Sequence, residues 1–330
     1  MKIAVIGAGS WGTTLANLLA QAGNQVHLWV REAELLNEIK TKGENTWFLP
    51  GIALCPSLKT DSDLEKVLHK ASCFLLAVPC QYLRSVLEQA QSLFPRNPVL
   101  VCASKGIELS SLKPMSQVVK DTLSSLEPRY AILSGPSFAR EVSQGLPTAV
   151  SLGCADKNLG QELQAILSTK TFRVYTNPDV QGVELGGAIK NIMAIASGIS
   201  DGLNFGHDAR AALITRGLAE MSRLGVSLGA QAKTFMGLSG MGDLVLTCTG
   251  DLSRNRRVGL ELGQGQNLEQ IVSQMKMVAE GVKTTEAVHN LSKDLQVELP
   301  ITEQVYRMLY SGKDPLQAVT ELMCRELKEE

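Results

Sequence analysis

A lysine in an otherwise uncharged stretch is the residue with the clearest chemical use. Lys190 is the only charged residue between Leu185 and Ser200, a segment whose apolar content predicts a long helix. In a desolvated cleft, an ammonium releases its proton more readily than the ordinary lysine pKa of about 10.4 suggests. We therefore interpret Lys190 as a general acid/base. The alternative is a core helix whose lysine extends its amine to the surface.

Two adjacent glycines, Gly186 and Gly187, precede this lysine. In a helix interior each costs roughly 1 kcal/mol relative to alanine. We interpret the pair as room for something flat to approach the helix backbone. Asn177 as N-cap and Pro178 at the first helical position predict where this helix begins.

A glycine-rich segment near the N-terminus predicts a dinucleotide site. Residues 2–6 are a short apolar run, typical of a strand buried on both faces, and residues 7–12 read G-A-G-S-W-G before an amphipathic helix. This is the G-x-G-x-x-G fingerprint in its required strand–turn–helix setting. The pyrophosphate is expected at the N-terminus of that helix, where free N–H groups and the helix dipole favour an anion.

Each residue of the fingerprint has an expected task. Gly7 permits the tight turn, Gly9 lets the backbone approach the pyrophosphate, and Gly12 lets helix and strand pack closely. Ser10 and Trp11 lie in the loop itself, so we expect them to contact the dinucleotide.

The end of the second predicted strand, residues 25–30, bears on which dinucleotide binds. An acid at this place holds the ribose 2′-hydroxyl of NADH, whereas an arginine accommodates the 2′-phosphate of NADPH. Here Arg31 comes first and Glu32 follows. Arg31 favours NADPH, and Glu32 leaves NADH open. The alternative is that the two form an exposed start of a helix.

Further apolar strands are predicted at residues 73–79, 98–103, 129–133, 148–152 and 172–175, with a helix at 61–69 between the second and third. In a doubly wound sheet the carboxyl ends of strands point to the ligand crevice. Lys105 follows one such end and is a candidate contact for an anionic or carbonyl substrate; the alternative is a surface loop lysine. Residues 134–139 follow the next and offer N–H and hydroxyl donors in a glycine–proline turn.

From Pro178 onward the hydrophobic period is helical, so we predict a dinucleotide-binding domain at residues 1–180 and a helical substrate domain at 181–330. A glycine-rich bend at residues 238–244 carries one carboxylate, Asp243. This carboxylate could orient Lys190 and stabilise its charged form, or it could simply form the turn.

A dense basic cluster, residues 253–257, reads S-R-N-R-R. Arginine forks, an amide and a hydroxyl together make a good phosphate cradle, and a solvated basic face is the alternative. Further on, a loop at residues 278–283 is expected to enter a helix at 284–291, with Glu280 as a ribose or amide partner. Helices are predicted to close the chain at residues 301–310 and 315–327.

Composition excludes several classes of protein. A formal net charge of −1 argues against a nucleic-acid-binding protein, which carries a strong basic excess. The seven cysteines form no C-x-x-C pair, which fits reduced thiols in a cytoplasmic protein. The four histidines lack metal-ligand spacing, so no metal site is expected. The segment around Lys190 is polar enough to predict a buried helix rather than stable membrane insertion.

Taken together, the motifs make the whole chain resemble the bacterial, NAD(P)-dependent family of glycerol-3-phosphate dehydrogenases. The segments that carry the resemblance appear in the family's order and run from end to end: residues 7–12, 134–139, 187–191, 212–217, 240–244 and 253–257. The resemblance implies an α/β plus all-α architecture, with an N-terminal Rossmann-type doubly wound sheet, a C-terminal all-helical domain and an active site between them.

The resemblance also implies an activity and its residues. The reaction is reduction of dihydroxyacetone phosphate to sn-glycerol 3-phosphate, the backbone precursor of phospholipids, with Lys190 as proton donor. Positions matching the family's substrate site, besides Lys190, are Lys105, Gly135, Ser137, Asp243, Ser253, Arg254 and Asn255. Positions matching its NADPH or NADH site are Ser10, Trp11, Arg31, Lys105, Ala139, Arg254, Val278 and Glu280.

Two competing interpretations stay open at this level. One is a related lysine-dependent reductase that acts on a hydroxy acid or another ketone, for which the basic cluster would be superfluous. The other is a non-catalytic dinucleotide-sensing regulator, which leaves Lys190 unexplained. The sequence leaves the oligomeric state open, a homodimer included.

Overall fold

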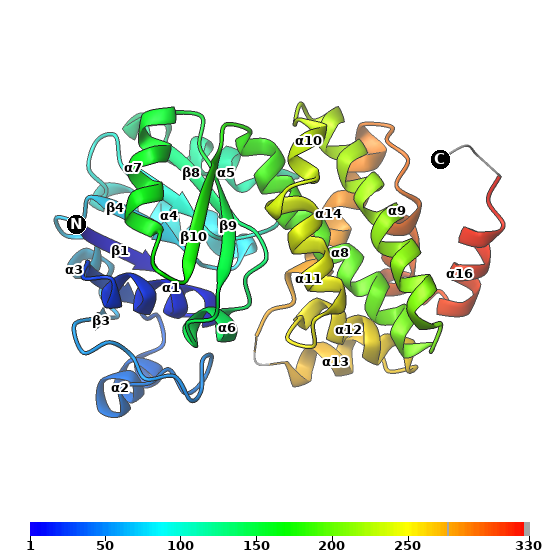
Figure 1. Cartoon of the computed structure of the whole chain (residues 1–330), viewed down its shortest axis with the longest axis horizontal. Helices are drawn as coiled ribbons and strands as arrows, with labels where there is room; N and C mark the ends of the chain where they lie inside the picture. The colour runs from blue at the N-terminus through cyan, green and yellow to red at the C-terminus, as the bar shows by residue number, and fades with distance from the viewer. Residues whose placement is uncertain (276, 327–330) are drawn as a thin grey trace.

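The computed structural model describes residues 1–275 and 277–326 of the chain, which form two parts lying side by side along the long axis (Figure 1). The N-terminal part is a sheet with helices on both faces, and the C-terminal part consists of helices. This confirms the predicted combination of a doubly wound sheet with a helical region.

The main sheet has eight strands in the order β10-β9-β8-β5-β4-β1-β2-β3. Neighbouring strands are parallel except for β8 and β9, which pair antiparallel. The strands are β1 (Lys2–Ile6), β2 (Gln25–Trp29), β3 (Lys59–Asp61), β4 (Cys73–Leu76), β5 (Val99–Cys102), β8 (Arg129–Ser134), β9 (Thr148–Gly153) and β10 (Phe172–Asn177). A separate pair, β6 (Ile107–Glu108) and β7 (Lys113–Pro114), lies outside this sheet.

Helices cover both faces of the sheet, and each face has its own hydrophobic core. In β1, Ile3 and Val5 belong to one core, whereas Ala4 and Ile6 belong to the other. This two-sided burial explains the near-continuous apolar runs in the sequence. The covering helices are α1 (Ser10–Gln21), α2 (Ala33–Lys42), α3 (Leu64–Leu68), α4 (Cys80–Ala90), α5 (Met115–Leu123), α6 (Ala139–Ser143) and α7 (Lys157–Leu167).

The strand order reverses beside β1, because β2 lies on one side of it and β4 on the other. A crevice opens at such a reversal, outside the carboxyl ends of the strands. The loops after β1 and β4 meet there: a Cβ on Gly7 would clash with the backbone carbonyl of Ala77. The sheet therefore places the glycine-rich loop at the edge expected to bind a ligand.

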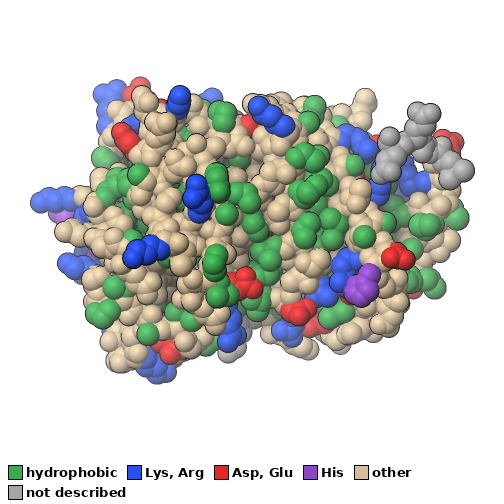
Figure 2. All heavy atoms as spheres, in the orientation of Figure 1, with side chains coloured by type: hydrophobic (Ala, Val, Ile, Leu, Met, Phe, Trp, Pro, Cys, Tyr) green, Lys and Arg blue, Asp and Glu red, His purple; other side chains and the backbone are tan. Residues whose placement is uncertain are grey.

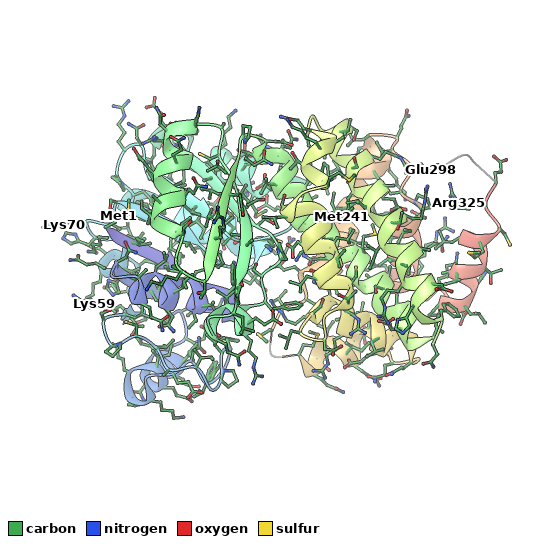
Figure 3. All side chains as sticks on the ribbon, viewed as in Figure 1. Met1, Lys59, Lys70, Met241, Glu298 and Arg325 are labelled. Atoms are coloured by element: carbon green, nitrogen blue, oxygen red, sulfur yellow. The ribbon has the colours of Figure 1, made fainter. Side chains whose placement is uncertain are left out.

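The helical part is built around α8 (Val180–Gly202), whose residues from Gly182 to Ser200 are all buried. A helix buried all round has no solvent-facing polar side, which is why this segment is mostly apolar, with Glu184 and Lys190 as its buried charged residues. Around it lie α9 (Gly206–Ser227), α10 (Ala232–Phe235), α11 (Asp243–Thr249), α12 (Arg254–Gly263), α14 (Glu280–Asp294) and α15 (Pro300–Tyr310). Farther out, α13 (Leu268–Gln274) packs against α12, and α16 (Pro315–Met323) packs against α15. After α16, Arg325 pairs with Glu298, which precedes α15 (Figure 3).

The predicted start of the central helix is wrong by a few residues. Its N-cap is Asp179, whose side chain accepts a hydrogen bond from the N–H of Gly182. Asn177, two residues before the N-cap, instead accepts a hydrogen bond from the N–H of Asp179. An aspartate outcompetes the earlier signal because its carboxylate reaches the first free N–H groups of the helix.

The paired glycines of α8 make room for protein rather than for a flat ligand. A Cβ on Gly186 would overlap the carbonyl oxygen of Ser239, and one on Gly187 would overlap the hydroxyl of Ser134. Ser239 belongs to a single π-helical turn, η3 (Leu238–Gly242), and Ser134 ends β8. The glycines thus let α8 pack closely between the sheet and η3.

Other predicted boundaries differ locally. Within predicted helix 61–69, Asp61 ends strand β3 and the helix is only α3, capped by Asp63. The predicted loop 278–283 already turns helical at Glu280. The last predicted helix ends at Met323, and Leu327 lies outside the described residues.

The surface carries charged side chains of both signs, as the near-zero net charge of the sequence implies (Figure 2). On the face shown in Figure 2, Lys and Arg side chains are scattered among acidic and apolar ones. In the described part of the chain, no helix combines the length and the apolar character needed to cross a bilayer.

Candidate active site

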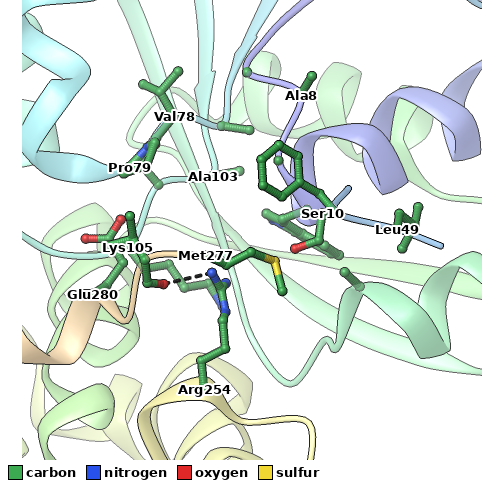
Figure 4. A pocket seen from close by; sticks show the side chains of 18 of the residues that line it. Ala8, Ser10, Leu49, Val78, Pro79, Ala103, Lys105, Arg254, Met277 and Glu280 are labelled. Carbon is green, nitrogen blue, oxygen red and sulfur yellow. Dashed lines mark hydrogen bonds between the residues drawn. The ribbon is translucent and has the colours of Figure 1, made fainter. Parts of the chain in front are cut away.

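A cavity of about 720 Å³ lies where the sheet and the helical part meet. It is lined from the sheet side by the loops after β1, β4, β5 and β8, and from the helical side by α8, α11, α12 and the start of α14. Figure 4 shows Lys105, Arg254 and Glu280 reaching it from three different elements.

The glycine-rich loop fits a dinucleotide pyrophosphate. Gly7 has φ of 113°, a conformation that favours glycine, and a Cβ on Gly12 would overlap the carbonyl oxygen of Gly7. A Cβ on Gly9, in contrast, would meet nothing within 4 Å, so this glycine faces open space. Gly9 caps α1 without a side-chain hydrogen bond, which leaves the N-terminal N–H groups available to an anion.

Ser10, Trp11 and Ala139 all line the cavity, as predicted for contacts with the cofactor. The Trp11 ring packs at a tilt against Phe172, with ring centroids 6.4 Å apart. Its indole Nε1 is buried and has no hydrogen-bond partner among the described residues.

Arg31 and Glu32 lie together on the wall of the cavity. Arg31 donates to one oxygen of Glu32 from Nε at 2.9 Å and from a terminal nitrogen at 2.6 Å. The Arg31 side chain is 69% exposed and that of Glu32 is 30% exposed. Both side chains are therefore accessible to a ribose, and each neutralises the other in the protein alone.

Lys190 is buried, with only 7% of its surface exposed. Its Nζ donates to Asp243 Oδ1 at 2.5 Å and to the hydroxyl of Thr247 at 2.9 Å. Burial lowers the pKa of Lys190 from 10.5 to about 8, although the neighbouring Asp243 opposes the shift. The amine thus has the poised acidity expected of a general acid/base near neutral pH.

Asp243 binds a second lysine as well. Lys105 Nζ donates to Asp243 Oδ2 at 2.8 Å and to the carbonyl of Gly135 at 3.3 Å. Burial acts to raise the pKa of Asp243, but the two ammonium groups outweigh it and hold that pKa below its ordinary value. Two cations around one anion leave a net positive charge in the cavity, which attracts an anionic substrate.

Of the other predicted substrate residues on the sheet side, Ser137 lines the cavity and donates to the carbonyl of Gly135 at 2.9 Å. Gly135 has φ of 141°, and a Cβ there would clash with Val150. Gly135 contributes its carbonyl oxygen, which accepts the hydrogen bond from Lys105 Nζ.

The basic cluster, residues 253–257, lies at the start of α12, and its side chains point to different places. Ser253 is the N-cap, and its hydroxyl accepts from the N–H of Arg256. Arg254 borders the cavity and donates to the carbonyl of Val278 at 2.8 Å (Figure 4). Asn255 also borders it, while its amide nitrogen donates to Asn191 and its oxygen accepts from the N–H of Gly281.

The remaining two arginines of the cluster have other partners. Arg256 forms ion pairs with Asp201 and Asp251, and Arg257 pairs with Glu261 on the next turn. Neither lines the cavity. The interpretation of the whole cluster as a phosphate cradle therefore narrows to Ser253, Arg254 and Asn255, because successive residues of a helix point in different directions.

Glu280 borders the cavity but bonds to the protein rather than standing free. Its two carboxylate oxygens accept from the N–H and the thiol of Cys80, at 3.1 and 2.9 Å. Cys80 is the first residue of α4, so Glu280 joins the helical part to the sheet part. Val278, also predicted as a cofactor contact, is on the cavity wall.

Several lining residues had no role in the sequence analysis. Thr247, which binds Lys190, lies four residues after Asp243, and this helical spacing could have identified it. Asn191 follows Lys190 directly. The loop residues Phe48, Leu49 and Pro50 line the cavity from a segment that carried no recognisable signal.

Comparison with known proteins follows the same division of the chain. The model of the NAD-dependent glycerol-3-phosphate dehydrogenase N-terminus matches residues 2–160, and that of the C-terminus matches residues 179–320. A glycerol-3-phosphate dehydrogenase [NAD(P)+] from Maridesulfovibrio salexigens is 64% identical over the full length of both chains. One from Geobacter sulfurreducens is 56% identical over all of this chain and 98% of its own.

Solved structures give the same result. The crystal structure of glycerol-3-phosphate dehydrogenase from Coxiella burnetii superposes with a TM-score of 0.95 at 42% identity, covering 98% of this chain and 99% of that one. Two family models that together span most of the chain, and relatives this similar along its whole length, show that the chain belongs to the NAD-dependent glycerol-3-phosphate dehydrogenase family.

Proposed function

We propose that this protein catalyses the reversible NAD(P)H-dependent reduction of dihydroxyacetone phosphate to sn-glycerol 3-phosphate, which supplies the backbone of phospholipids. The observation that carries the proposal is that Lys190 and Lys105, joined through the buried Asp243, line one cavity with the glycine-rich loop and Arg254. Relatives bearing the name of this activity support it.

The dinucleotide would bind along the sheet side of the cavity. Its pyrophosphate would lie over Gly9 at the start of α1, and the remaining proposed contacts are Gly7, Ser10, Trp11, Gly12, Arg31, Lys105, Ala139, Arg254, Val278 and Glu280. A bound reduced nicotinamide supplies the hydride. The coexistence of Arg31 and Glu32 on the wall favours use of both NADPH and NADH, with Arg31 favouring NADPH.

The substrate phosphate would contact Arg254 and the free N–H groups at the start of α12. The guanidinium and the positive end of the helix dipole both favour an anion there. Lys190 would donate its proton to the carbonyl oxygen, where negative charge develops during reduction. Asp243 and Thr247 hold the amine for this task, and Lys105 adds a second cation beside the same carboxylate. In the oxidation direction the neutral amine accepts the proton instead.

A substrate panel tests the assignment. Purified protein with NADPH or NADH is offered dihydroxyacetone phosphate and unphosphorylated dihydroxyacetone, and absorbance of the reduced nicotinamide is followed. We expect kcat/KM for the phosphorylated ketone to exceed that for the other by far. Faster turnover of an unphosphorylated ketone would reject the assignment in favour of a related reductase.

The same experiment separates an enzyme from a dinucleotide-sensing regulator. A regulator binds NADPH without consuming it, and it has no use for a buried lysine with a pKa of about 8. We further propose that residues 1–180 form the dinucleotide-binding domain and 181–330 the substrate domain, and that the protein acts in the cytoplasm.

A further inference from the structure

Glu184, on the first turns of α8, is a buried carboxylate with no part in the proposed chemistry. Only 2% of its surface is exposed. Its Oε1 accepts from the N–H of Ser116 at 2.8 Å and from the hydroxyl of Tyr130 at 2.9 Å, and its Oε2 accepts from the Ser116 hydroxyl at 2.6 Å. Three donors from the sheet part thus converge on one side chain of the central helix.

This carboxylate supplies a cap that α5 lacks. The N-cap residue of α5 is Pro114, which makes no side-chain hydrogen bond, and its first turn contains no acid. Ser116 is the second residue of that helix, so its N–H is one of the groups that has no partner within the helix. Glu184 reaches it from another element and also complements the positive end of the helix dipole.

The contacts of α8 with β8 continue from this cap toward the catalytic lysine. Tyr130 and Ser134, both on β8, meet Glu184 and Gly187 respectively. Glu184, Gly187 and Lys190 follow one another at intervals of three residues, so they form a row that winds around α8, and Lys190 points about 120° away from Glu184. Because the helix is rigid, a contact that fixes the direction of Glu184 also fixes that of Lys190.

We propose that Glu184 is a positioning residue for Lys190: by capping α5 it sets the rotation of α8 about its own axis and aims the lysine at Asp243. Lys190 Nζ lies 2.5 Å from Asp243 Oδ1, and a rotation of α8 would lengthen this distance. The proposal rests on the proposed function only for its kinetic test, since the direction of the side chain is a property of the protein alone.

Glu220 provides a matched control. It is a carboxylate of α9 with 3% of its surface exposed, and it caps α15 in the same way through the N–H groups of Ile301 and Thr302. It does not line the cavity. Glu184→Leu and Glu220→Leu each remove a buried acceptor from a helix N-terminus, so both should lower Tm, but only the first should misplace Lys190.

The kinetic expectations follow. Glu184→Leu should lower kcat by on the order of 10–100-fold with little change in KM, because a shift of about 1 Å at a reacting group costs that much. Glu184→Gln should recover most of the activity, since its amide oxygen can replace Oε1 and its amide nitrogen can donate to the Ser116 hydroxyl. Glu220→Leu should keep the kcat of the parent protein. Equal kcat for Glu184→Leu and the parent, or an equal loss in Glu220→Leu, would overturn the proposal.

A second readout needs no turnover. Competitive acetylation of Lys190 as a function of pH, read by mass spectrometry, gives the pKa of its amine. The groups around that amine are Asp243 and Thr247 on α11 and Lys105 after β5, with burial as the largest influence. In Glu184→Leu the pKa should fall below about 8, because the rotation draws the amine away from Asp243, whose charge raises that pKa, and an unchanged pKa would contradict the proposal.

The two readouts keep the proposals distinguishable. A parent protein that fails to reduce dihydroxyacetone phosphate would reject the proposed function, whereas acetylation would still test the role of Glu184. If Glu184→Leu does not fold, the double variant Ser116→Ala/Tyr130→Phe removes two donors while keeping the carboxylate and the aromatic ring. It should lower both kcat and the pKa of Lys190, as in Glu184→Leu, and parent values for both would overturn the proposal.

Discussion

Lys190 and Asp243 are joined by a hydrogen bond of 2.5 Å although 53 residues separate them in the chain. The other oxygen of Asp243 accepts from Lys105 at 2.8 Å. Because both oxygens hold ammonium groups, the carboxylate is occupied and cannot itself serve as the proton carrier. The Asp243 charge acts to raise the pKa of Lys190 against the effect of burial, and we propose that it also fixes the direction of the lysine N–H bonds.

The pH dependence of the reaction follows from the pKa of Lys190, about 8. With Lys190 as the proposed proton donor, reduction needs the ammonium form, so kcat/KM for dihydroxyacetone phosphate should fall as pH rises through about 8. Oxidation of glycerol 3-phosphate needs the neutral amine and should rise over the same range. Asp243→Asn removes the charge that raises this pKa, so the pH profiles of reduction and oxidation should both move to lower pH. Profiles that stay in place would mean that the group that titrates is not Lys190.

Removal of the amine tests its role directly. Lys190→Ala should lower kcat by on the order of 10²–10⁴, the usual contribution of a positioned acid/base. Cofactor affinity, measured by titration calorimetry, should change little, because the glycine-rich loop is untouched. Survival of activity would mean that the proton comes from another group.

Arg254 and Arg257 offer a matched pair within one helix. Arg254 borders the cavity, whereas Arg257 pairs with Glu261 outside it. Arg254→Ala should lower kcat/KM for dihydroxyacetone phosphate by about 10–100-fold, the worth of a hydrogen bond to a charged group. Arg257→Ala should be nearly neutral. If kcat/KM for unphosphorylated dihydroxyacetone fell by the same factor in the Arg254 variant, this result would contradict a phosphate contact.

Gly9 and Gly12 should fail in different ways when replaced by alanine. A Cβ at Gly9 meets no atom of the described residues within 4 Å, so Gly9→Ala should keep Tm and lose affinity for NADPH and NADH. At Gly12 the new methyl overlaps the Gly7 carbonyl, so the overpacked variant should lose roughly 1–3 kcal/mol of stability. Thermal unfolding and cofactor titration of both proteins distinguish the two; full cofactor affinity in Gly9→Ala would place the pyrophosphate elsewhere.

The Arg31–Glu32 pair is expected to govern cofactor choice. Arg31→Glu should raise KM for NADPH far more than KM for NADH, because only the former brings a phosphate to this residue. Glu32→Ala releases Arg31 from its partner and should lower KM for NADPH. Equal effects of Arg31→Glu on both cofactors would remove this arginine from the binding site.

The sequence by itself determined what depends on neighbouring residues. Periodicity identified strands β1 and β4 and the buried helix α8, and the spacing of Gly7, Gly9 and Gly12 predicted the turn between β1 and α1 that we propose binds the dinucleotide. These signals are local, because a strand, a turn and a helix start are each specified by residues close together in the chain. Lys190 stood out for the same reason, as one charge in an apolar stretch.

Tertiary structure decided which distant side chains meet. It separated Arg254 from Arg256 and Arg257, filled the space beside Gly186 and Gly187 with protein, and joined Glu184 to α5. It also buried the amine of Lys190 and thereby lowered its pKa. Local spacing does not predict any of these contacts, because burial and pairing depend on how whole helices pack against a sheet. A small rotation of one helix changes which of its side chains contact the neighbouring elements.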